Sequence, residues 1–252
     1  MPHSIPIAVL DEVDSTNRVA LARAQAGETG PLWIMAARQT AGRGRAGRAW
    51  ASEPGNLYAT LLLRLTCHPT AVPGLSLLSG VAVYDATVAA AGRPVPGLRL
   101  KWPNDVLIGS TKCAGILAES LVGREAVTVA IGIGINLAWH PADLGREATH
   151  LAAHGVTSPP AAMLEFLSAA MARWLADWNN GAGFAAVRTA WLERTGAMGE
   201  ACTVNTGTER IGGSFAGLDD TGSLLIADST GTIRTVTFGD VTLDATSESS
   251  GR

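Results

Sequence analysis

Residues 42–50 read GRGRAGRAW, so that three glycines alternate with three arginines. The chain carries a net charge of −3, which makes this run of guanidinium groups unusual. Glycine lets backbone N–H groups crowd around an anion, and guanidinium binds phosphate or carboxylate through a bidentate fork. No Lys-Ser or Lys-Thr follows the glycines, and their spacing is not that of a dinucleotide-binding fingerprint. The sequence therefore predicts an anion-binding loop of another kind.

Two other interpretations of this arginine loop (residues 42–50) stay open at this point. The first is an exposed basic turn, and the second is a flexible Arg-Gly tether for nucleic acid. The next acid after the arginines is Glu53, so a plain turn would leave their charge uncompensated in the local sequence. The run is also short and lies between apolar strand candidates at 32–37 and 57–65. Both observations favour a binding site.

Four further segments carry groups that could contact a ligand, and each also has a plainer interpretation. Residues 101–105 read KWPND, which is typical of a hairpin loop. Residues 112–117 read KCAGIL, where the lysine is a solvated residue at a sheet edge or a cation held over a pocket. Residues 132–137 read GIGINL, in which Asn136 is a turn residue or a ligand contact. Residues 14–17 read DSTN, which alone is an ordinary helix cap.

Apolar periodicity predicts strands and helices over the first 195 residues. Strands are predicted at 5–13, 32–37, 57–65, 98–102, 106–108, 115–121 and 127–137. Within the last of these, residues 129–135 (VAIGIGI) have the continuous apolar character of a strand buried on both faces. Helices are predicted at 17–26, 75–91, 161–178 and 184–194. The third helix has an apolar stripe that we expect to face the core: Met163, Phe166, Leu167, Ala170, Met171, Trp174 and Trp178.

The composition changes after Thr195. Residues 196–243 are rich in Thr, Val, Gly and Asp and alternate with a period of two. The turn sequences DDTG (219–222) and DSTG (228–231) separate short strand candidates. We therefore predict a mixed α/β domain at 1–195, a small β module at 196–245, and a disordered tail at 246–252.

The bulk composition excludes several classes of protein. With 252 residues, of which 47% are hydrophobic and 16% charged, the chain can bury a core and is not disordered. Its three dispersed cysteines predict reduced thiols and no structural zinc site. Acids among the first dozen residues argue against a signal peptide, and residues 72–91 are too polar to span a bilayer. We expect a cytoplasmic protein that binds neither a membrane nor, given its net charge, a bulk polyanion.

In this order and spacing, the five segments together resemble the biotin–protein ligases, which activate biotin with ATP and load it onto a lysine of a carrier protein. The family pattern has a TN-containing motif, Q-x-x-G-R-G-R-x-G-R-x-W, KWPND, K-x-x-G-I-L and a G-x-G-x-N strand, and each is present. Ile133 stands where some members have alanine. The resemblance spans the chain apart from the tail. It implies an α+β fold, with a mixed-sheet catalytic domain of the biotin/lipoate ligase type and a C-terminal SH3-like β-barrel.

The resemblance also implies a role for each motif residue. The biotin-binding set is Ser15, Thr16, Asn17, Gln39, Arg43, Gly44, Arg45, Lys112 and Gly115. The ATP-binding set is Arg48, Trp50, Asn104 and Asn136. The catalytic set is Lys112, Arg45 and Asp105, with Asp105 orienting or deprotonating the acceptor lysine. Mg²⁺ is expected to arrive with ATP, and no residue is assigned to a metal held by the protein alone.

The implied partner is a biotin carboxyl carrier protein or domain of a biotin-dependent carboxylase, and the implied oligomeric state is a monomer or a weak homodimer. Some members carry an N-terminal helix-turn-helix domain. Here DSTN begins at residue 14, so we expect no such domain and no DNA binding. Two rival functions are a lipoate–protein ligase or octanoyltransferase, which shares the catalytic fold, and an RNA-binding module. The complete arginine loop and KWPND argue against the first, and the net charge and lack of an aromatic cluster beside the loop argue against the second.

Overall fold

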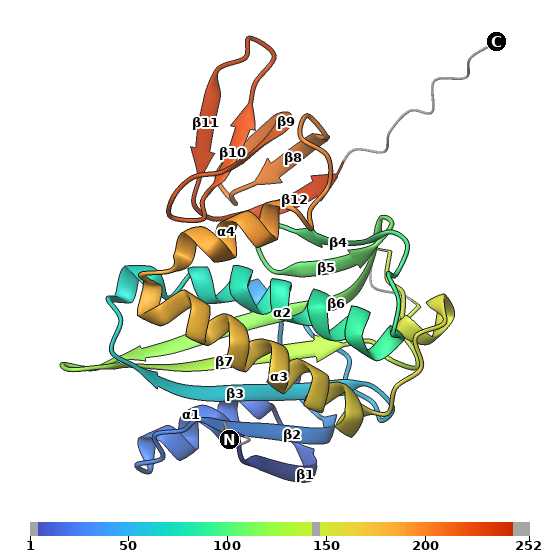
Figure 1. Cartoon of the computed structure of the whole chain (residues 1–252), viewed down its shortest axis with the longest axis vertical. Helices are drawn as coiled ribbons and strands as arrows, with labels where there is room; N and C mark the ends of the chain where they lie inside the picture. The colour runs from blue at the N-terminus through green and yellow to red at the C-terminus, as the bar shows by residue number, and fades with distance from the viewer. Residues whose placement is uncertain (1–4, 143–146, 244–252) are drawn as a thin grey trace.

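The computed structural model describes residues 5–142 and 147–243, and these residues build two β-sheets and four α-helices (Figure 1). The seven-stranded sheet has the order β1-β2-β3-β7-β6-β5-β4. Its strands are β1 (Ile7–Val13), β2 (Leu32–Gln39), β3 (Leu57–Leu65), β4 (Leu98–Lys101), β5 (Asp105–Ile108), β6 (Thr111–Val122) and β7 (Val127–Ile135). The helices are α1 (Thr16–Gln25), α2 (Gly74–Ala91), α3 (Pro160–Trp178) and α4 (Phe184–Leu192).

The first sheet is mixed, as predicted. Strands β1 and β2 pair in parallel, because helix α1 carries the chain back between them. The pairs β2–β3, β3–β7, β7–β6, β6–β5 and β5–β4 are antiparallel. Strand β6 begins at Thr111 rather than at residue 115, so that Lys112 lies inside a strand instead of ahead of one.

The centre of this sheet is buried on both faces, which confirms the prediction for residues 129–135. Trp33 and Ile131 face the large core that includes α2 and α3, while Ile34 and Ala130 face a smaller cluster under α1. All four are fully buried. Because side chains alternate along a strand, positions 132 and 134 continue the row on the α1 side. Both are glycine, which lets side chains from other elements lie directly on the sheet at that point.

Helices α2 and α3 cover the other face of the sheet (Figure 1). Of the described residues, Pro69–Ala91 alone forms a helical stretch long and apolar enough to cross a bilayer, but 61% of its apolar window is buried within the fold. Helix α3 buries most of its predicted stripe, namely Met163, Leu167, Met171, Trp174 and Trp178. The prediction was wrong for Phe166, which is 39% exposed at the margin of the stripe.

The second sheet is five-stranded and antiparallel in the order β11-β10-β9-β8-β12, and it lies beyond α4 and β4 (Figure 1). Its strands are β8 (Ala201–Asn205), β9 (Arg210–Leu218), β10 (Leu224–Ala227), β11 (Ile233–Val236) and β12 (Asp240–Leu243). Both predicted turns are confirmed: the Asp219 carboxylate accepts hydrogen bonds from the Thr221 and Ser223 N–H groups, and Asp228 makes the equivalent turn. The expected tail at 246–252 lies outside the described residues.

The KWPND turn joins the two sheets, so it is more than a hairpin loop. The Trp102 indole donates a buried hydrogen bond of 3.0 Å to the carbonyl oxygen of Gly222. Gly222 has a positive φ of 87°, and a Cβ there would lie 2.8 Å from Leu77 and 2.9 Å from Phe184. The absence of a side chain thus allows the second sheet to approach α2 and α4 closely. The boundary between 195 and 196 stays a prediction.

Candidate active site

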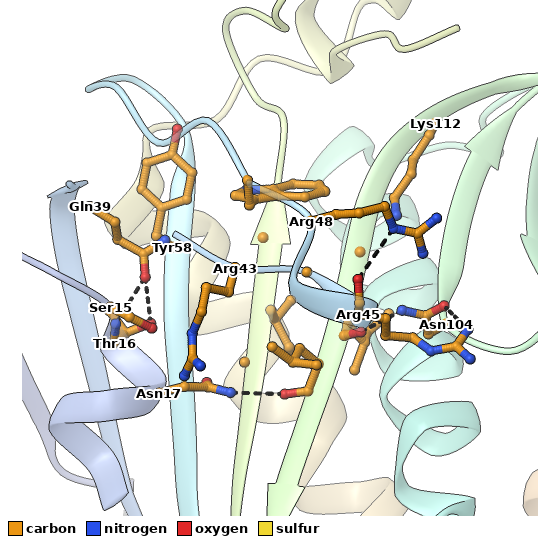
Figure 2. Close-up of a pocket in the computed structure, with 18 residues that line it drawn as sticks. Ser15, Thr16, Asn17, Gln39, Arg43, Arg45, Arg48, Tyr58, Asn104 and Lys112 are labelled. Atoms are coloured by element: carbon orange, nitrogen blue, oxygen red, sulfur yellow. Dashed lines mark hydrogen bonds between the residues drawn. The ribbon is translucent and has the colours of Figure 1, made fainter. Parts of the chain in front are cut away.

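One pocket gathers nearly all of the predicted site residues. It opens above the glycines of β7, between the start of α1, strand β6 and the arginine loop (Figure 2). Its lining includes every predicted residue except Asp105 and Asn136: Ser15, Thr16, Asn17, Gln39, Arg43, Gly44, Arg45, Arg48, Trp50, Asn104, Lys112 and Gly115. Tyr58, Ile116, Leu117, Gly132, Ile133 and Gly134 complete it. Segments almost 120 residues apart in sequence therefore share a single cavity.

Neutral polar groups form one side of the pocket. The Gln39 Oε1 atom accepts hydrogen bonds from the Thr16 N–H (2.9 Å) and hydroxyl (3.1 Å). The buried Thr60 hydroxyl lies within hydrogen-bonding distance of both Thr16 Oγ1 (2.8 Å) and Asn17 Oδ1 (2.7 Å). Asn17 Nδ2 donates to Glu119 at 2.7 Å. This network orients short hydroxyl and amide groups, which suit a neutral ligand with its own donors and acceptors.

The DSTN segment is a helix start whose side chains serve the pocket as well. Ser15 occupies the N-cap position of α1, but its side chain makes no capping hydrogen bond. Ser15, Thr16 and Asn17 are each only 4% exposed. An ordinary cap would direct the hydroxyl at the first turn of the helix, and here the Ser15 side chain lines the cavity instead.

The glycines of β6 and β7 form the floor. A Cβ at Gly132 would collide with Asn17 Oδ1, and a Cβ at Gly134 would lie 2.6 Å from the Trp50 indole. At Gly115, a Cβ would lie 2.9 Å from Lys112 Nζ. Each glycine therefore allows a functional side chain to lie directly on the sheet, which a side chain at the same position would prevent.

The arginine loop is a small hairpin folded over the pocket. Arg43 and Ala49 form an isolated antiparallel β-bridge. The Gly44 N–H donates to the Arg48 carbonyl oxygen at 2.7 Å, and the Trp50 N–H donates to the Gly42 carbonyl oxygen at 2.9 Å. The tip (Arg45–Gly47) turns through positive φ values of 53° at Ala46 and 72° at Gly47. Figure 2 shows Arg45, Arg48, Asn104 and Lys112 grouped on the side of the pocket away from Ser15 and Thr16. The cavity thus has a side of neutral polar groups, beside which Arg43 is paired with Glu119, and a cationic side.

The loop arginines are paired with acids that are distant in sequence. Arg43 lies 3.4 Å from Glu119, and Arg48 lies 2.9 Å from Asp240. Arg45 donates to Asn104 Oδ1 at 3.2 Å, and burial lowers the pKa of its guanidinium, an effect that Asp240 opposes. Glu53, the nearest acid in the sequence, instead pairs with Arg38. The local sequence lacks counter-charges for these arginines, and tertiary contacts supply them.

Lys112 belongs to a buried ion cluster and is not a solvated edge residue. Its Nζ donates to Asp105 Oδ1, and the two side chains are each 12% exposed. Lys101 Nζ lies 3.3 Å from the other oxygen of Asp105. Lys112 Nζ also lies 5.3 Å from the centre of the Trp50 ring, a cation–π distance. The cluster places Asp105 directly behind Lys112, outside the lining of the pocket.

The charge state of Asp105 follows from this cluster. Burial alone would raise the pKa of its carboxyl group, but Lys112 and Lys101 outweigh burial, and the pKa lies below the ordinary value of 3.8. Because the pKa of this carboxyl group is lower in the folded than in the unfolded protein, its ionisation stabilises the fold at any pH above the unfolded-state pKa. That contribution is lost as the pH falls through the folded-state pKa. We therefore expect the melting temperature of the wild type to exceed that of Asp105→Asn by a constant amount above about pH 5. This difference should shrink below pH 3.8. An advantage that grew on acidification, in thermal unfolding monitored by circular dichroism, would contradict this.

Asn136 lies in a second, smaller cavity next to the first. This cavity is lined by Ala49, Trp50, Ala51, Lys112, Asn136, Pro141 and Ala148, so that Trp50 and Lys112 form part of both walls. Asn136 donates to the carbonyl oxygen of Thr149 at 2.9 Å. The Trp50 indole N–H is buried and, among the described residues, has no hydrogen-bond partner. A buried donor without a partner at the junction of two cavities suits a ligand that spans both.

Three charged residues around the site were missed at the level of sequence. Lys101 completes the pairing of Asp105, and Glu119 and Asp240 neutralise the loop arginines. Lys101 had a usable signal, because it is one of just two lysines in the chain and opens the KWPND motif that contains Asp105. Nothing in the local sequence distinguishes Glu119 or Asp240 from other acids.

Comparison with known proteins places this geometry in a family. Residues 9–136 match the family described as Biotin/lipoate A/B protein ligase, and residues 197–244 match the Biotin protein ligase C terminal domain. The chain is 41% identical to a biotin–[acetyl-CoA-carboxylase] ligase of Paracoccus denitrificans, over 88% of this chain and 95% of that protein. It is 31% identical to the bifunctional ligase/repressor BirA of Bacillus subtilis, over 92% of this chain and 72% of the relative.

Solved structures agree with the sequence matches. The biotin protein ligase from Aquifex aeolicus in complex with biotin and ATP superposes with a TM-score of 0.78 at 28% identity, covering 95% of this chain and 98% of that one. The biotin protein ligase from Leishmania major in complex with biotinyl-5-AMP superposes with a TM-score of 0.65 at 26% identity, covering 92% of this chain and 99% of that one. The motifs, both sheets and the two domain matches all lead to the same assignment: this chain belongs to the biotin protein ligase family.

Proposed function

We propose that the protein is an ATP-dependent biotin–protein ligase that makes biotinyl-5′-AMP and transfers the biotinyl group to a lysine of a biotin carboxyl carrier protein or domain. The observation that carries the proposal is the two-sided pocket, in which neutral polar groups face a cluster of cations (Figure 2). Biotin has the matching asymmetry, with a neutral cyclic urea at one end and a carboxylate at the other. The relative from Paracoccus denitrificans, named for acetyl-CoA carboxylase, supports a carboxyl carrier as the acceptor.

The neutral side of the pocket suits the urea head. Thr16, Asn17 and Gln39 are held by one another and by Thr60, so their donors and acceptors are oriented before a ligand arrives. A buried polar ligand loses water on binding, and preformed partners offset that loss. Gly132 and Gly134 let Asn17 and the Trp50 indole lie directly on the sheet, where they line the space for the ring system and its chain.

The cationic side suits the first reaction step. The biotin carboxylate attacks the α-phosphate of ATP, the bond to pyrophosphate breaks, and the mixed anhydride forms. Both reactants are anions, so Arg45, Arg48 and Lys112 lower their mutual repulsion and stabilise charge in the transition state. The adjoining cavity with Trp50 and Asn136 would hold the adenine ring. Closure of the arginine loop would shield the reactive anhydride from water.

The donor set also bears on the Mg²⁺ that we expect with ATP. Among the described residues, no three His, Cys, Asp or Glu side chains cluster in a way that could hold a metal ion. Mg²⁺ is commonly bound through substrate phosphates and water with few protein ligands. We therefore propose that it enters with ATP, neutralising phosphate charge, while the arginine loop and Lys112 contact the remaining oxygens.

In the second step, the acceptor lysine attacks the anhydride carbonyl, the bond to AMP breaks, and the lysine amine loses a proton. The attacking amine must be neutral. Asp105 lies next to Lys112, and so is close to the place where the carbonyl would sit, and it is an ionised carboxylate. We assign to Asp105 the orientation of the amine and acceptance of its proton, directly or through water.

A labelled-substrate assay tests the proposal against its nearest rival. The protein is incubated with ATP, Mg²⁺, either a biotin carboxyl carrier domain or a lipoyl domain, and either labelled biotin or labelled lipoate. We expect ATP-dependent labelling of the carrier by biotin alone. Labelling by lipoate on a lipoyl domain, with none by biotin, would assign the protein to the other branch of the shared catalytic fold.

The floor of the pocket yields a prediction about biotin affinity. In Gly132→Ala the new methyl group displaces Asn17, so a ligand-facing polar group is lost and biotin binding weakens by about 10- to 100-fold. The matched control is Gly212→Ala, a strand glycine in β9 with nothing within 4 Å of the added carbon. Isothermal titration calorimetry with biotin measures both. Equal affinities for the two variants would remove Gly132 from the biotin site.

A further inference from the structure

We propose that Asp240, which lies outside the pocket on the second sheet, is a positioning residue that holds the arginine loop closed. Asp240 Oδ1 lies 2.9 Å from Arg48 Nη2 and 3.6 Å from Arg45 Nη1. The neighbouring carbonyl oxygen of Gly239 accepts a hydrogen bond of 3.1 Å from Arg45 Nη2. Two consecutive residues of the C-terminal module therefore bind both guanidinium groups near the tip of the loop.

Within residues 5–142 and 147–243, these contacts are the shortest polar links between the arginine side chains of the loop and the rest of the protein. Among the described residues, the other links from arginine side chains of the loop are Arg45 to Asn104 at 3.2 Å and Arg43 to Glu119 at 3.4 Å. The tip itself has positive φ at Ala46 and Gly47 and buries no residue. A short hairpin of this kind has little stability of its own, so its closed position depends on what its side chains bind.

The support under Asp240 is rigid. Strand β12 pairs with β8, with Asp240 opposite Asn205. Gly239 has a φ of 148°, and a Cβ there would lie 2.7 Å from Val204 and 3.0 Å from the Asn205 carbonyl oxygen. The backbone that presents the Gly239 carbonyl and the Asp240 carboxylate is thus packed directly on β8, and it can act as a fixed anchor for the loop.

The direction of the contact indicates positioning and not competition with the substrate. Arg45 and Arg48 line the pocket, whereas Asp240 is not part of its lining. The carboxylate therefore binds the guanidinium groups from outside the cavity. A residue in that position lowers the free energy of the closed loop without occupying the anion site, so its removal weakens substrate binding. A competing carboxylate would have the opposite effect.

The same edge of the C-terminal module holds a third cation of the site. Lys101 Nζ donates to the Val241 carbonyl oxygen at 3.1 Å while it also pairs with Asp105. Residues 239–241 thus contact Arg45, Arg48 and Lys101 in succession. Of the three, Asp240 contributes through its side chain, which makes it the residue that substitution can test.

Trypsin tests the proposal without any ligand, because it cleaves after arginine and the loop has three. We expect Asp240→Ala and the isosteric Asp240→Asn to be cut within the loop about fivefold faster than wild type, since cleavage follows the population of the open loop and exposed ion pairs are worth about that much. Asp240→Glu should restore much of the protection. The control is Glu209→Ala, which removes an exposed partner of Arg234 from the same sheet and should leave loop cleavage unchanged. Mass spectrometry identifies the loop fragments.

A kinetic measurement, which rests on the proposed function, separates positioning from a structural role. In biotin-dependent ATP–pyrophosphate exchange, Asp240→Asn should raise the KM for biotin and ATP about fivefold with kcat within about twofold, at an unchanged melting temperature. Loop cleavage equal to wild type in both Asp240→Ala and Asp240→Asn, or a lowered KM, would overturn the proposal. A wild-type protein without exchange activity would refute the proposed function alone, because the trypsin result stands independently.

Discussion

Replacement of Lys112 by alanine is expected to lower biotin-dependent ATP–pyrophosphate exchange by about 10³-fold. Lys112 contributes a positive charge to the walls of both cavities, at the point where a carboxylate and a phosphate would meet. Its side chain is 12% exposed, so solvent screens this charge weakly, and a well-placed cation in such a site stabilises developing negative charge strongly. Exchange of label between pyrophosphate and ATP measures the first step alone.

The same assay on Arg45→Ala should show a loss of similar size. Arg45 lines the pocket, and its guanidinium is oriented by Asn104 and by the Gly239 carbonyl oxygen. Arg210→Ala, an exposed arginine at the start of β9, controls for the change in net charge. Turnover within about twofold of wild type for both Lys112→Ala and Arg45→Ala, in protein of unchanged melting temperature, would refute the assignment of this pocket as the site of biotin activation.

Substitution of Asp105 by asparagine is expected to impair the second step more than the first. If the carboxylate accepts the proton of the acceptor lysine, transfer to a carrier domain should slow by about 10²- to 10⁴-fold, the usual contribution of a general base. Adenylate formation should fall less, because the reaction of carboxylate with ATP transfers no proton to a base. Lys112 also loses its ionised partner in this variant, so some loss in the first step is expected.

Single-turnover experiments separate the two steps. Preformed biotinyl-5′-AMP is mixed with enzyme and carrier domain, and transfer is followed directly. The pH profile gives a second criterion: a base contribution makes the wild-type advantage shrink as rising pH deprotonates the acceptor amine, whereas a structural contribution does not follow that titration. Equal losses in both steps would leave Asp105 as a counter-ion for Lys112 and Lys101 without a role in proton transfer.

The sequence predicted the strands and helices well where the apolar pattern was long. The strand at 57–65 has the predicted bounds, and residues 129–135 are buried on both faces as predicted. Errors came where a neighbouring element decides the outcome. Strand β6 extends back to Thr111 because residues 105–108 pair with it. Phe166 lies at the margin of the α3 stripe, and periodicity does not specify how wide a face its neighbours cover.

The sequence by itself determined the family, the mixed sheet and most of the polar residues that line the pocket, because these depend on motif chemistry and on spacing along the chain. Tertiary structure alone decided the charge balance of the site. The counter-ions of the loop arginines come from positions 119 and 240, and Asp105 is held between Lys101 and Lys112. An ion pair depends on distance in space, and no local pattern reports which of 22 acids lies within 4 Å of a given arginine once the chain has folded.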